Sequence, residues 1–271
     1  MNRKTNKPKL NRLPNFVRLI ALLFLSNELL ASPSKTVPKE YFKEFTLDGQ
    51  IPILSWYIDG TYSTDKPLEY LKTEIDKNIE LIKQGKENYY GSTDTWLYEA
   101  LKKHPIKGKE VAIIGSATCW YESIVLAYGG NPTTIEYNKI VTDDSRLTIL
   151  TVDEFSQHPR KFDVIISISS LEHDGLGRYG DPINPKGDLE FMLNAKEKLL
   201  KKGGTMFLAV PIGQDTLVWN AHRKYGKKRF SLLVDGWDII DSFGFSEERF
   251  NDPLSTGGGY QPVFYLSPKN N

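Results

Sequence analysis

The chain has 271 residues, enough for one sizeable domain with an extension or for two small ones. Its 35 Lys and Arg nearly balance its 34 Asp and Glu, but six basic residues and one acid fall within residues 1–31. The other 240 residues carry 29 basic and 33 acidic side chains, a net charge of −4, which argues against sequence-independent nucleic-acid binding. The sole cysteine, Cys119, excludes an intramolecular disulfide and a CxxC metal site, and no metal is expected.

Residues 1–31 have the pattern of a targeting segment. A basic stretch leads into seven apolar residues, 19–25, which are too few for a relaxed membrane-spanning helix of about 20 residues. They match the apolar region of a secretory signal peptide or a signal anchor. We therefore expect a secretory or membrane-associated protein that contacts the membrane only through this segment. A mitochondrial transit peptide and a surface extension of a cytoplasmic protein are the alternatives.

Residues 32–108 are expected to form an N-terminal helical extension of a domain that spans residues 109–271. Residues 33–62 are rich in Pro, Tyr and Phe without a clear period, which predicts an irregular wrap. Apolar side chains at helical spacing predict helices over residues 67–84 and 93–103.

The stretch after residue 109 predicts a strand, a turn, a helix and a second strand. Residues 111–114 form an apolar run typical of a buried parallel strand, and small residues follow from Gly115. A helix over residues 120–128 precedes a strand that ends at Glu136. A carboxylate about 20 residues past a glycine turn suits the ribose hydroxyls of an adenosine-bearing cofactor. Because the turn is not GxGxxG, a purely structural βαβ unit is the alternative.

The rest of the chain continues the alternation. A helix is expected over residues 187–202, ended by two glycines, and the glycine run 257–259 is expected to form a hairpin turn. Further strands are predicted at residues 147–151, 162–168, 205–210, 245–250 and 263–266. The pattern predicts an α/β fold with a doubly wound, mostly parallel sheet and helices on both faces.

Four segments of the sequence resemble class I S-adenosylmethionine-dependent methyltransferases. They are EVAIIGS, TTIEYN, FDVIISISSLEH and LLKKGGTMFLAVP, within residues 109–266. LEHDGLGRYGDPINPKGDLE and VPIGQDTLVWNAHRKYG are similar to an uncharacterised family, domain of unknown function 268. The resemblance implies a seven-stranded Rossmann-like fold with S-adenosylmethionine as the cofactor. The chain departs from the methyltransferase pattern at GSATC, where a multi-glycine run is usual.

The resemblance also implies a cofactor site at the carboxyl ends of the strands, where open parallel sheets bind ligands. Gly115 and Ser116 would pass beneath the methionine part of the cofactor, and Glu136 would hold the ribose. Asp153 would meet the adenine amino group. The alternatives are a surface role for Glu136 and a helix-capping role for Asp153.

The residues that follow the fourth predicted strand point to acid–base chemistry. Glu172 and His173 are candidate catalytic residues, since a neutral imidazole can take a proton from a hydroxyl or an amine. The alternative is that His173 only satisfies backbone groups.

Two later loops are candidate substrate-binding segments. In residues 175–181, Arg178 is expected to bind a carboxylate or phosphate beside Tyr179. In residues 219–226, His222 and Arg223 favour an anionic or sugar-like ligand, with a solvated basic turn as the alternative.

These features favour a methyltransferase that acts on a small or glycan-like acceptor. A catalytically inactive methyltransferase-like binding or scaffold protein is the second hypothesis, supported by the departure in the glycine loop. The third is an NAD-dependent or nucleotide-sugar-dependent enzyme, because Glu136 also suits the ribose of NAD.

Overall fold

The computed structural model describes residues 34–58 and 67–269. The predicted targeting segment, residues 1–31, lies outside these ranges and stays a prediction. Across the two ranges, no helix combines the length and the apolar character that crossing a membrane requires.

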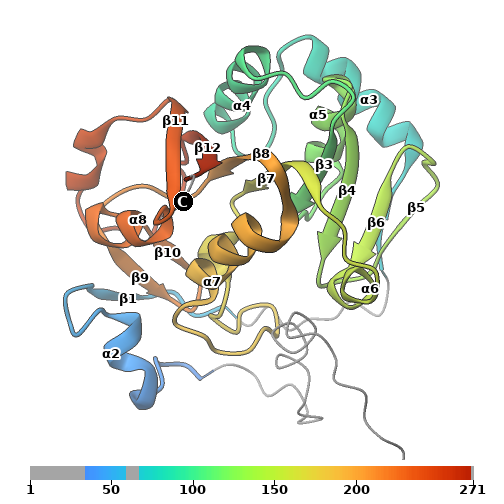
Figure 1. The fold of residues 1–271 in the computed structure, drawn as a ribbon. Helices are drawn as coiled ribbons and strands as arrows, with labels where there is room; N and C mark the ends of the chain where they lie inside the picture. The colour runs from blue at the N-terminus through green and yellow to red at the C-terminus, as the bar shows by residue number, and fades with distance from the viewer. Residues whose placement is uncertain (1–33, 59–66, 270–271) are drawn as a thin grey trace, which may run out of the picture.

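A central sheet organises the described part of the chain (Figure 1). Its seven strands lie in the order β11-β12-β8-β7-β3-β4-β6. They are β3 (Glu110–Ile114), β4 (Asn131–Glu136), β6 (Thr148–Thr151), β7 (Phe162–Ile168), β8 (Leu200–Ala209), β11 (Trp237–Phe243) and β12 (Val263–Pro268). Neighbouring strands pair in parallel from β6 to β8, whereas β12 runs antiparallel to both β8 and β11. The predicted doubly wound, mostly parallel sheet is confirmed.

The apolar runs of the sequence form the two middle strands. Val111, Ala112 and Ile113 of β3 are all buried and pair with residues 164–166 of β7. A strand covered on both faces has no polar side to alternate with, which explains the continuous apolar run. Each buried Val or Ile side chain contributes about 1.5–3 kcal/mol to stability.

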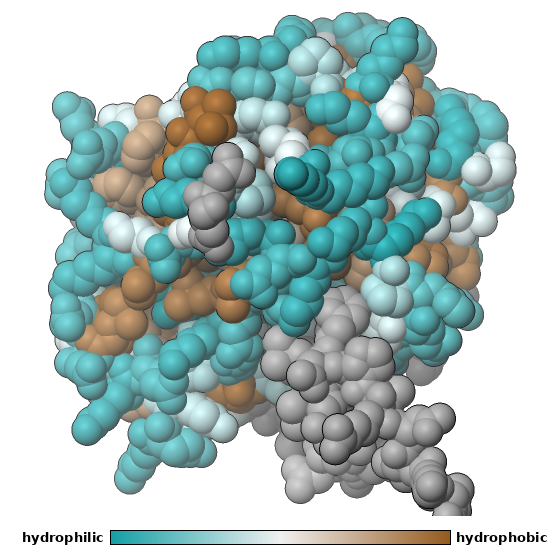
Figure 2. Space-filling model, in the orientation of Figure 1, coloured by the Kyte–Doolittle hydropathy of each residue, from teal (hydrophilic) through white to brown (hydrophobic). Residues whose placement is uncertain are grey.

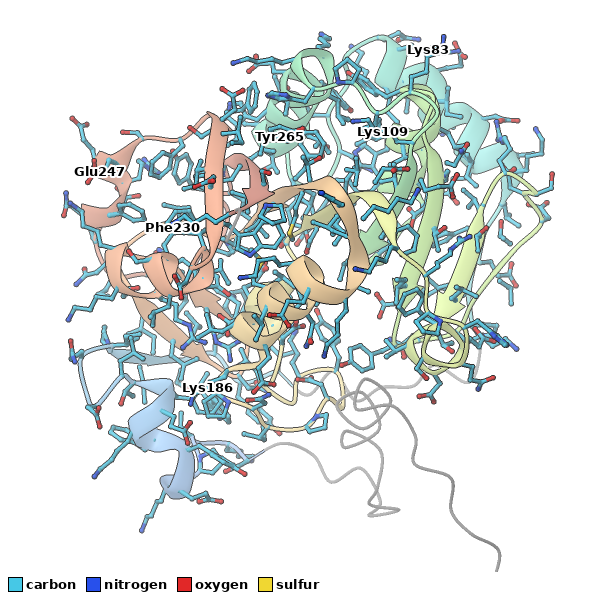
Figure 3. The ribbon with its side chains drawn as sticks, in the orientation of Figure 1. Lys83, Lys109, Lys186, Phe230, Glu247 and Tyr265 are labelled. Atoms are coloured by element: carbon cyan, nitrogen blue, oxygen red, sulfur yellow. The ribbon has the colours of Figure 1, made fainter. Side chains whose placement is uncertain are left out.

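Helices cover both faces of this sheet. One apolar cluster joins the sheet to α3 (Lys72–Lys83), α4 (Ser92–Lys103) and α5 (Trp120–Ala127). The other joins it to α6 (Val152–Gln157), α7 (Gly187–Asn194) and α8 (Lys227–Leu233). Phe230 points inward from α8, while Lys83 and Glu247 lie at the surface (Figure 3). The view in Figure 2 is mostly hydrophilic with scattered apolar residues, as expected of the solvated sides of amphipathic helices.

Two small sheets and several short helical turns complete the described residues. In the first small sheet, β9 (Thr216–Trp219) pairs in parallel with β1 (Ile53–Ser55) and antiparallel with β10 (His222–Lys224). In the second, β2 (Leu68–Tyr70) pairs in parallel with β5 (Ile140–Thr142). The short turns are η1 (Lys39–Tyr41), α2 (Phe42–Phe45), η2 (Leu171–His173), the π-helical η3 (Ala195–Leu199) and η4 (Glu247–Asn251).

Two helix boundaries differ from the predictions. The helix expected over residues 67–84 begins at Lys72, because the residues before Leu71 extend and pair as β2. The helix expected over residues 187–202 is α-helical only to Asn194 and continues as the π-helical turn η3. Strand β8 then begins at Leu200, which pairs with Phe162 at the start of β7.

Four segments differ from their predicted conformation. The strand expected at residues 245–250 is wrong, because Phe245 and Phe250 pack against Phe230 of α8 and Phe250 lies within η4. Within the irregular wrap expected over residues 33–62, the described residues 34–58 contain η1, α2 and β1. The loop expected at residues 219–226 includes β10, and residues 257–259 lie in the connection from η4 to β12 instead of a hairpin turn.

Candidate functional site

The chain turns sharply at Gly115, directly after β3. Gly115 has a φ of +72°, and a Cβ placed there would lie 2.2 Å from the Oγ of Ser170. Only glycine meets both conditions without strain. Ser170 follows β7, and the chain winds outward in opposite directions from the neighbouring strands β3 and β7. The turn therefore lies at the topological switch point, where open α/β sheets bind their ligands.

The carboxylate of Glu136 faces this turn. Its Oε2 accepts a hydrogen bond from the N–H of Ser116 at 3.0 Å, and its Oε1 accepts one from the N–H of Tyr137 at 2.7 Å. The indole of Trp120 lies in the apolar layer of α4 and α5, where its Nε1 donates to Asp94 at 3.0 Å. Gly115, Ser116 and Glu136 thus meet at the end of the sheet.

A buried network of polar side chains holds Ser116, the residue that follows Gly115 in the turn. The Oγ of Ser116 donates to the carbonyl of Thr118 at 2.8 Å, and it lies 3.1 Å from both the hydroxyl of Tyr70 and the Oε2 of Glu122. The Oε1 of Glu122 accepts from the hydroxyl of Thr134 at 2.6 Å. Burial raises the pKa of Glu122 to about 7. The hydroxyl of Ser116 has one hydrogen and donates it to the carbonyl of Thr118. A protonated Glu122 would therefore be the donor in its hydrogen bond with the Oγ of Ser116.

Sequence reasoning missed both Tyr70 and Glu122. Tyr70 lies 46 residues before Ser116 and carries no local signal of the contact. Glu122 carries no such signal either, because a residue two positions from Trp120 and Ile124 lies off the helix face that they share; it is buried because residues 120–125 of α5 are covered on all sides.

A second polar cluster follows β7. Glu172 accepts from the hydroxyl of Ser169 at 2.6 Å, and the side-chain amide of Gln261 donates to Ser169 at 2.9 Å. The Oε2 of Glu172 is buried and has no hydrogen-bond partner among the described residues. Burial raises the pKa of Glu172 to about 7.

Two imidazoles lie beside Glu172. The Nδ1 of His173 is 2.6 Å from the carbonyl of Ala221, to which it donates, and its Nε2 is 3.7 Å from the Oε1 of Glu172. Burial and the charge of Arg178 lower the pKa of His173 to about 3. The ring of His222 lies 6.3 Å from that of His173, and burial lowers its pKa to about 4. Both rings are therefore neutral at physiological pH.

Arg178 and Tyr179 join the same cluster. The guanidinium of Arg178 lies 4.9 Å from the ring centre of Tyr179, and its Nη1 donates to the carbonyl of Ala221 at 3.1 Å. The Nε of Arg178 has no partner within the described ranges. The ring of Tyr179 is 5.6 Å from that of His173. Five of the predicted catalytic and substrate residues therefore lie together: Glu172, His173, Arg178, Tyr179 and His222.

Arg223 faces the protein interior instead of the cluster. Its Nη1 donates to the carbonyl of Asp174 at 2.6 Å and its Nη2 to that of Asn184 at 3.3 Å. It therefore fastens the loop over residues 174–185 to β10, a structural role that differs from the expected substrate contact.

Asp153 is exposed in the first turn of α6. Asp153 does not cap this helix, because Thr151 is the N-cap and Glu154 completes a capping box with it.

The raised pKa values of the two buried glutamates predict a pH-dependent stability. Glu122 and Glu172 each titrate near pH 7 when folded, against 4.5 ordinarily. Because the pKa of each carboxyl is higher in the folded chain, the stability that the protonated carboxyl gives is complete below pH 4.5 and is lost as the pH rises through about 7. Each group then removes about 3 kcal/mol from the free energy of unfolding. Urea unfolding between pH 5 and 8 measures this loss.

The variant Glu122→Gln should flatten this profile, because an amide keeps the hydrogen bonds and does not titrate. Glu99→Gln, at an exposed position of α4, is the control and should keep the wild-type slope. A slope that Glu122→Gln leaves unchanged would contradict the titration of the buried carboxyl.

In the seven-stranded sheet, β12 alone runs antiparallel, and the glycine turn and the carboxylate of Glu136 lie at the ends of β3 and β4. This arrangement defines a class I methyltransferase-like Rossmann fold. The sequence model of the family described as "Caenorhabditis protein of unknown function, DUF268" matches residues 108–256, more than half of the chain. The chain belongs to that family. No curated protein matches the chain in sequence.

Several solved structures are similar to the chain at low sequence identity. One is 1,6-didemethyltoxoflavin-N1-methyltransferase of Burkholderia thailandensis with S-adenosylhomocysteine, 13% identical over 73% of this chain and 88% of that one, with a TM-score of 0.47. Magnesium protoporphyrin IX methyltransferase of Synechocystis PCC 6803 is 13% identical over 73% and 95%, with a TM-score of 0.41. The glycopeptide N-methyltransferase MtfA is 12% identical over 72% and 98%, with a TM-score of 0.42.

Proposed function

We propose that this protein is an S-adenosylmethionine-dependent methyltransferase that acts on a small or glycan-like acceptor. The observation that carries the proposal is the carboxylate of Glu136, held against the N–H of Ser116 at the switch point of the sheet. Each of its oxygens accepts one backbone N–H and keeps a lone pair. The residues therefore fit an adenosine ribose, whose two hydroxyls can donate to these oxygens without displacing the backbone.

The cluster after β7 is suited to handling the proton of the acceptor. S-adenosylmethionine would supply an electrophilic methyl group beside it. Proton transfer works best when the pKa of the base lies near the working pH, which favours Glu172 at about 7 over the two imidazoles. The His173 side chain is 16% exposed and that of Glu172 only 1%, so an acceptor meets the imidazole first. We assign the Nε2 of His173 to accept the proton of the acceptor and to pass it to Glu172, whose Oε1 lies 3.7 Å away.

A specific observation also favours the scaffold alternative. The Oγ of Ser170 occupies the space beside Gly115, and the GSATC loop lacks further glycines. A loop filled in this way would leave less room for the methionine part of the cofactor.

Titration calorimetry of the full chain with S-adenosylhomocysteine tests the proposal. A micromolar Kd requires about 8 kcal/mol, and two charge-assisted hydrogen bonds to Glu136 would supply about 3–6 kcal/mol of it. We expect binding in this range and none of NAD. Absence of heat and of a thermal shift at millimolar S-adenosylhomocysteine would favour the scaffold, and tighter binding of NAD would favour the third hypothesis.

A further inference from the structure

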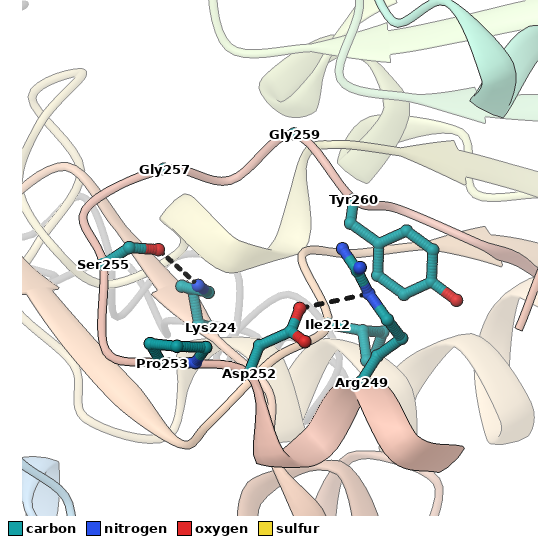
Figure 4. A pocket seen from close by; sticks show the side chains of 9 residues that line it. All are labelled: Ile212, Lys224, Arg249, Asp252, Pro253, Ser255, Gly257, Gly259 and Tyr260. Atoms are coloured by element: carbon teal, nitrogen blue, oxygen red, sulfur yellow. Dashed lines mark hydrogen bonds and ion pairs between the residues drawn. The ribbon is translucent and has the colours of Figure 1, made fainter. Parts of the chain in front are cut away.

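A pocket of about 500 Å³ lies beside the cluster, between β10, η4 and the glycine run of residues 257–259 (Figure 4). Its polar lining consists of Lys224, Arg249, Asp252 and Ser255. A volume of this size is typical of small-molecule sites, and none of these residues has a role in the proposed methyl transfer.

Lys224 is the cation of this pocket that forms no salt bridge among the described residues. It is only 6% exposed, and its Nζ donates to the hydroxyl of Ser255 at 2.8 Å. Arg249 is paired with Asp252 at 3.0 Å, so these two charges cancel. Across the described ranges, Lys224 has no carboxylate within salt-bridge distance. Burial lowers its pKa, and the nearby charge of Arg249 adds to this, whereas the charge of Asp252 offsets it only in part.

Gly257 and Gly259 line the same pocket and are exposed. A Cβ at Gly257 or Gly259 would meet nothing within 4 Å, so the backbone there borders open space. Their N–H groups have no hydrogen-bond partner within the part of the chain that the structure describes. Gly258 between them packs on the other side, where a Cβ would lie 3.3 Å from the Nε2 of His222. The pocket is thus separated from the His222 imidazole only by this segment.

We propose that this pocket binds a phosphate or sulfate ester group of the acceptor, a step that rests on the proposed methyl transfer. A tetrahedral oxyanion accepts several hydrogen bonds at once, and its negative charge would form an ion pair with the ammonium of Lys224. Lys224 would donate to it from β10, and the hydroxyl of Ser255 and the amides of Gly257 and Gly259 would donate from the loop that follows η4. The pocket is larger than one such group, which leaves room for the sugar that carries it.

Calorimetry on the full chain tests this proposal with glucose 6-phosphate, glucose 6-sulfate and glucose as probes. We expect at least one ester to bind and glucose to bind at least ten times more weakly. Lys224→Met should weaken ester binding tenfold or more. Lys102→Met, which removes the same charge from an exposed position of α4, should not change it. Gly257→Leu should also block the ester, and the open space at its Cβ favours normal folding.

The outcomes separate this inference from the proposed function. Ester binding that Lys224→Met abolishes while S-adenosylhomocysteine still binds would support the inference. A wild-type chain that binds S-adenosylhomocysteine but neither ester overturns the inference alone. Equal losses in Lys224→Met and Lys102→Met, or equal affinities for glucose and the esters, also overturn it. A chain that binds an ester but no S-adenosylhomocysteine keeps the anion site and contradicts the methyltransferase.

Discussion

Replacing Asp188 by alanine is expected to lower the free energy of unfolding by about 3–5 kcal/mol, the largest loss of stability that we predict. Asp188 is fully buried at the start of α7. It forms two hydrogen bonds with Arg229 of α8, accepts one from Tyr225 at 3.0 Å, and lies 3.8 Å from Arg223. Burial alone would raise its pKa, but the two guanidinium charges outweigh burial and lower it. Without this carboxylate, two buried cations lack a counter-charge.

Urea unfolding at pH 7 measures this loss, with Asp238→Ala at an exposed position of β11 as the control. Asp188→Asn should lose less, because the amide oxygen still accepts a hydrogen bond from Arg229. Stability within about 1 kcal/mol of the wild type in Asp188→Ala would show that the arginines find other partners. Because Arg223 also holds the loop over residues 174–185, the loop that carries Arg178 and Tyr179 should become more mobile.

Glu136→Ala should weaken S-adenosylhomocysteine binding by at least about 100-fold. Two charge-assisted hydrogen bonds at about 1.5–3 kcal/mol each would be lost, and the N–H of Ser116 would lose its acceptor. Competition calorimetry measures the change against the wild-type chain. Glu136→Gln keeps one acceptor oxygen without the negative charge, so its affinity for S-adenosylhomocysteine should lie between those of the wild-type chain and Glu136→Ala.

The control for charge loss is Glu99→Ala, at an exposed position of α4, which should bind as tightly as the wild type. An unchanged affinity in Glu136→Ala would refute the ribose role. Since Glu136 is half-buried at the carboxyl end of β4, its replacement should change stability far less than that of Asp188.

The fold was largely predictable because buried parallel strands leave a strong local signal. Residues 111–114 and 162–168 are continuous apolar runs, and both form strands at the centre of the sheet. The strand predicted at residues 245–250 is wrong because only Phe245 and Phe250 of this segment are apolar, and two aromatic residues at its ends fit a strand or a packed turn equally well. Only contact with Phe230 of α8 decided between them.

The sequence by itself determined the alternation of strands and helices and the place of Gly115 and Glu136 at neighbouring strand ends. Both follow from short-range patterns, because side-chain burial in one strand and the length of one βαβ unit are local quantities. Tertiary structure alone decided how buried polar groups are paired.

The network of Tyr70, Ser116 and Glu122 and the pairing of Asp188 with Arg229 join segments far apart in the chain. The surroundings of the buried Lys224 likewise depend on which side chains of η4 and the following loop reach it. No sequence period encodes such contacts, because the partner and the loss of water both arise only when distant elements pack together.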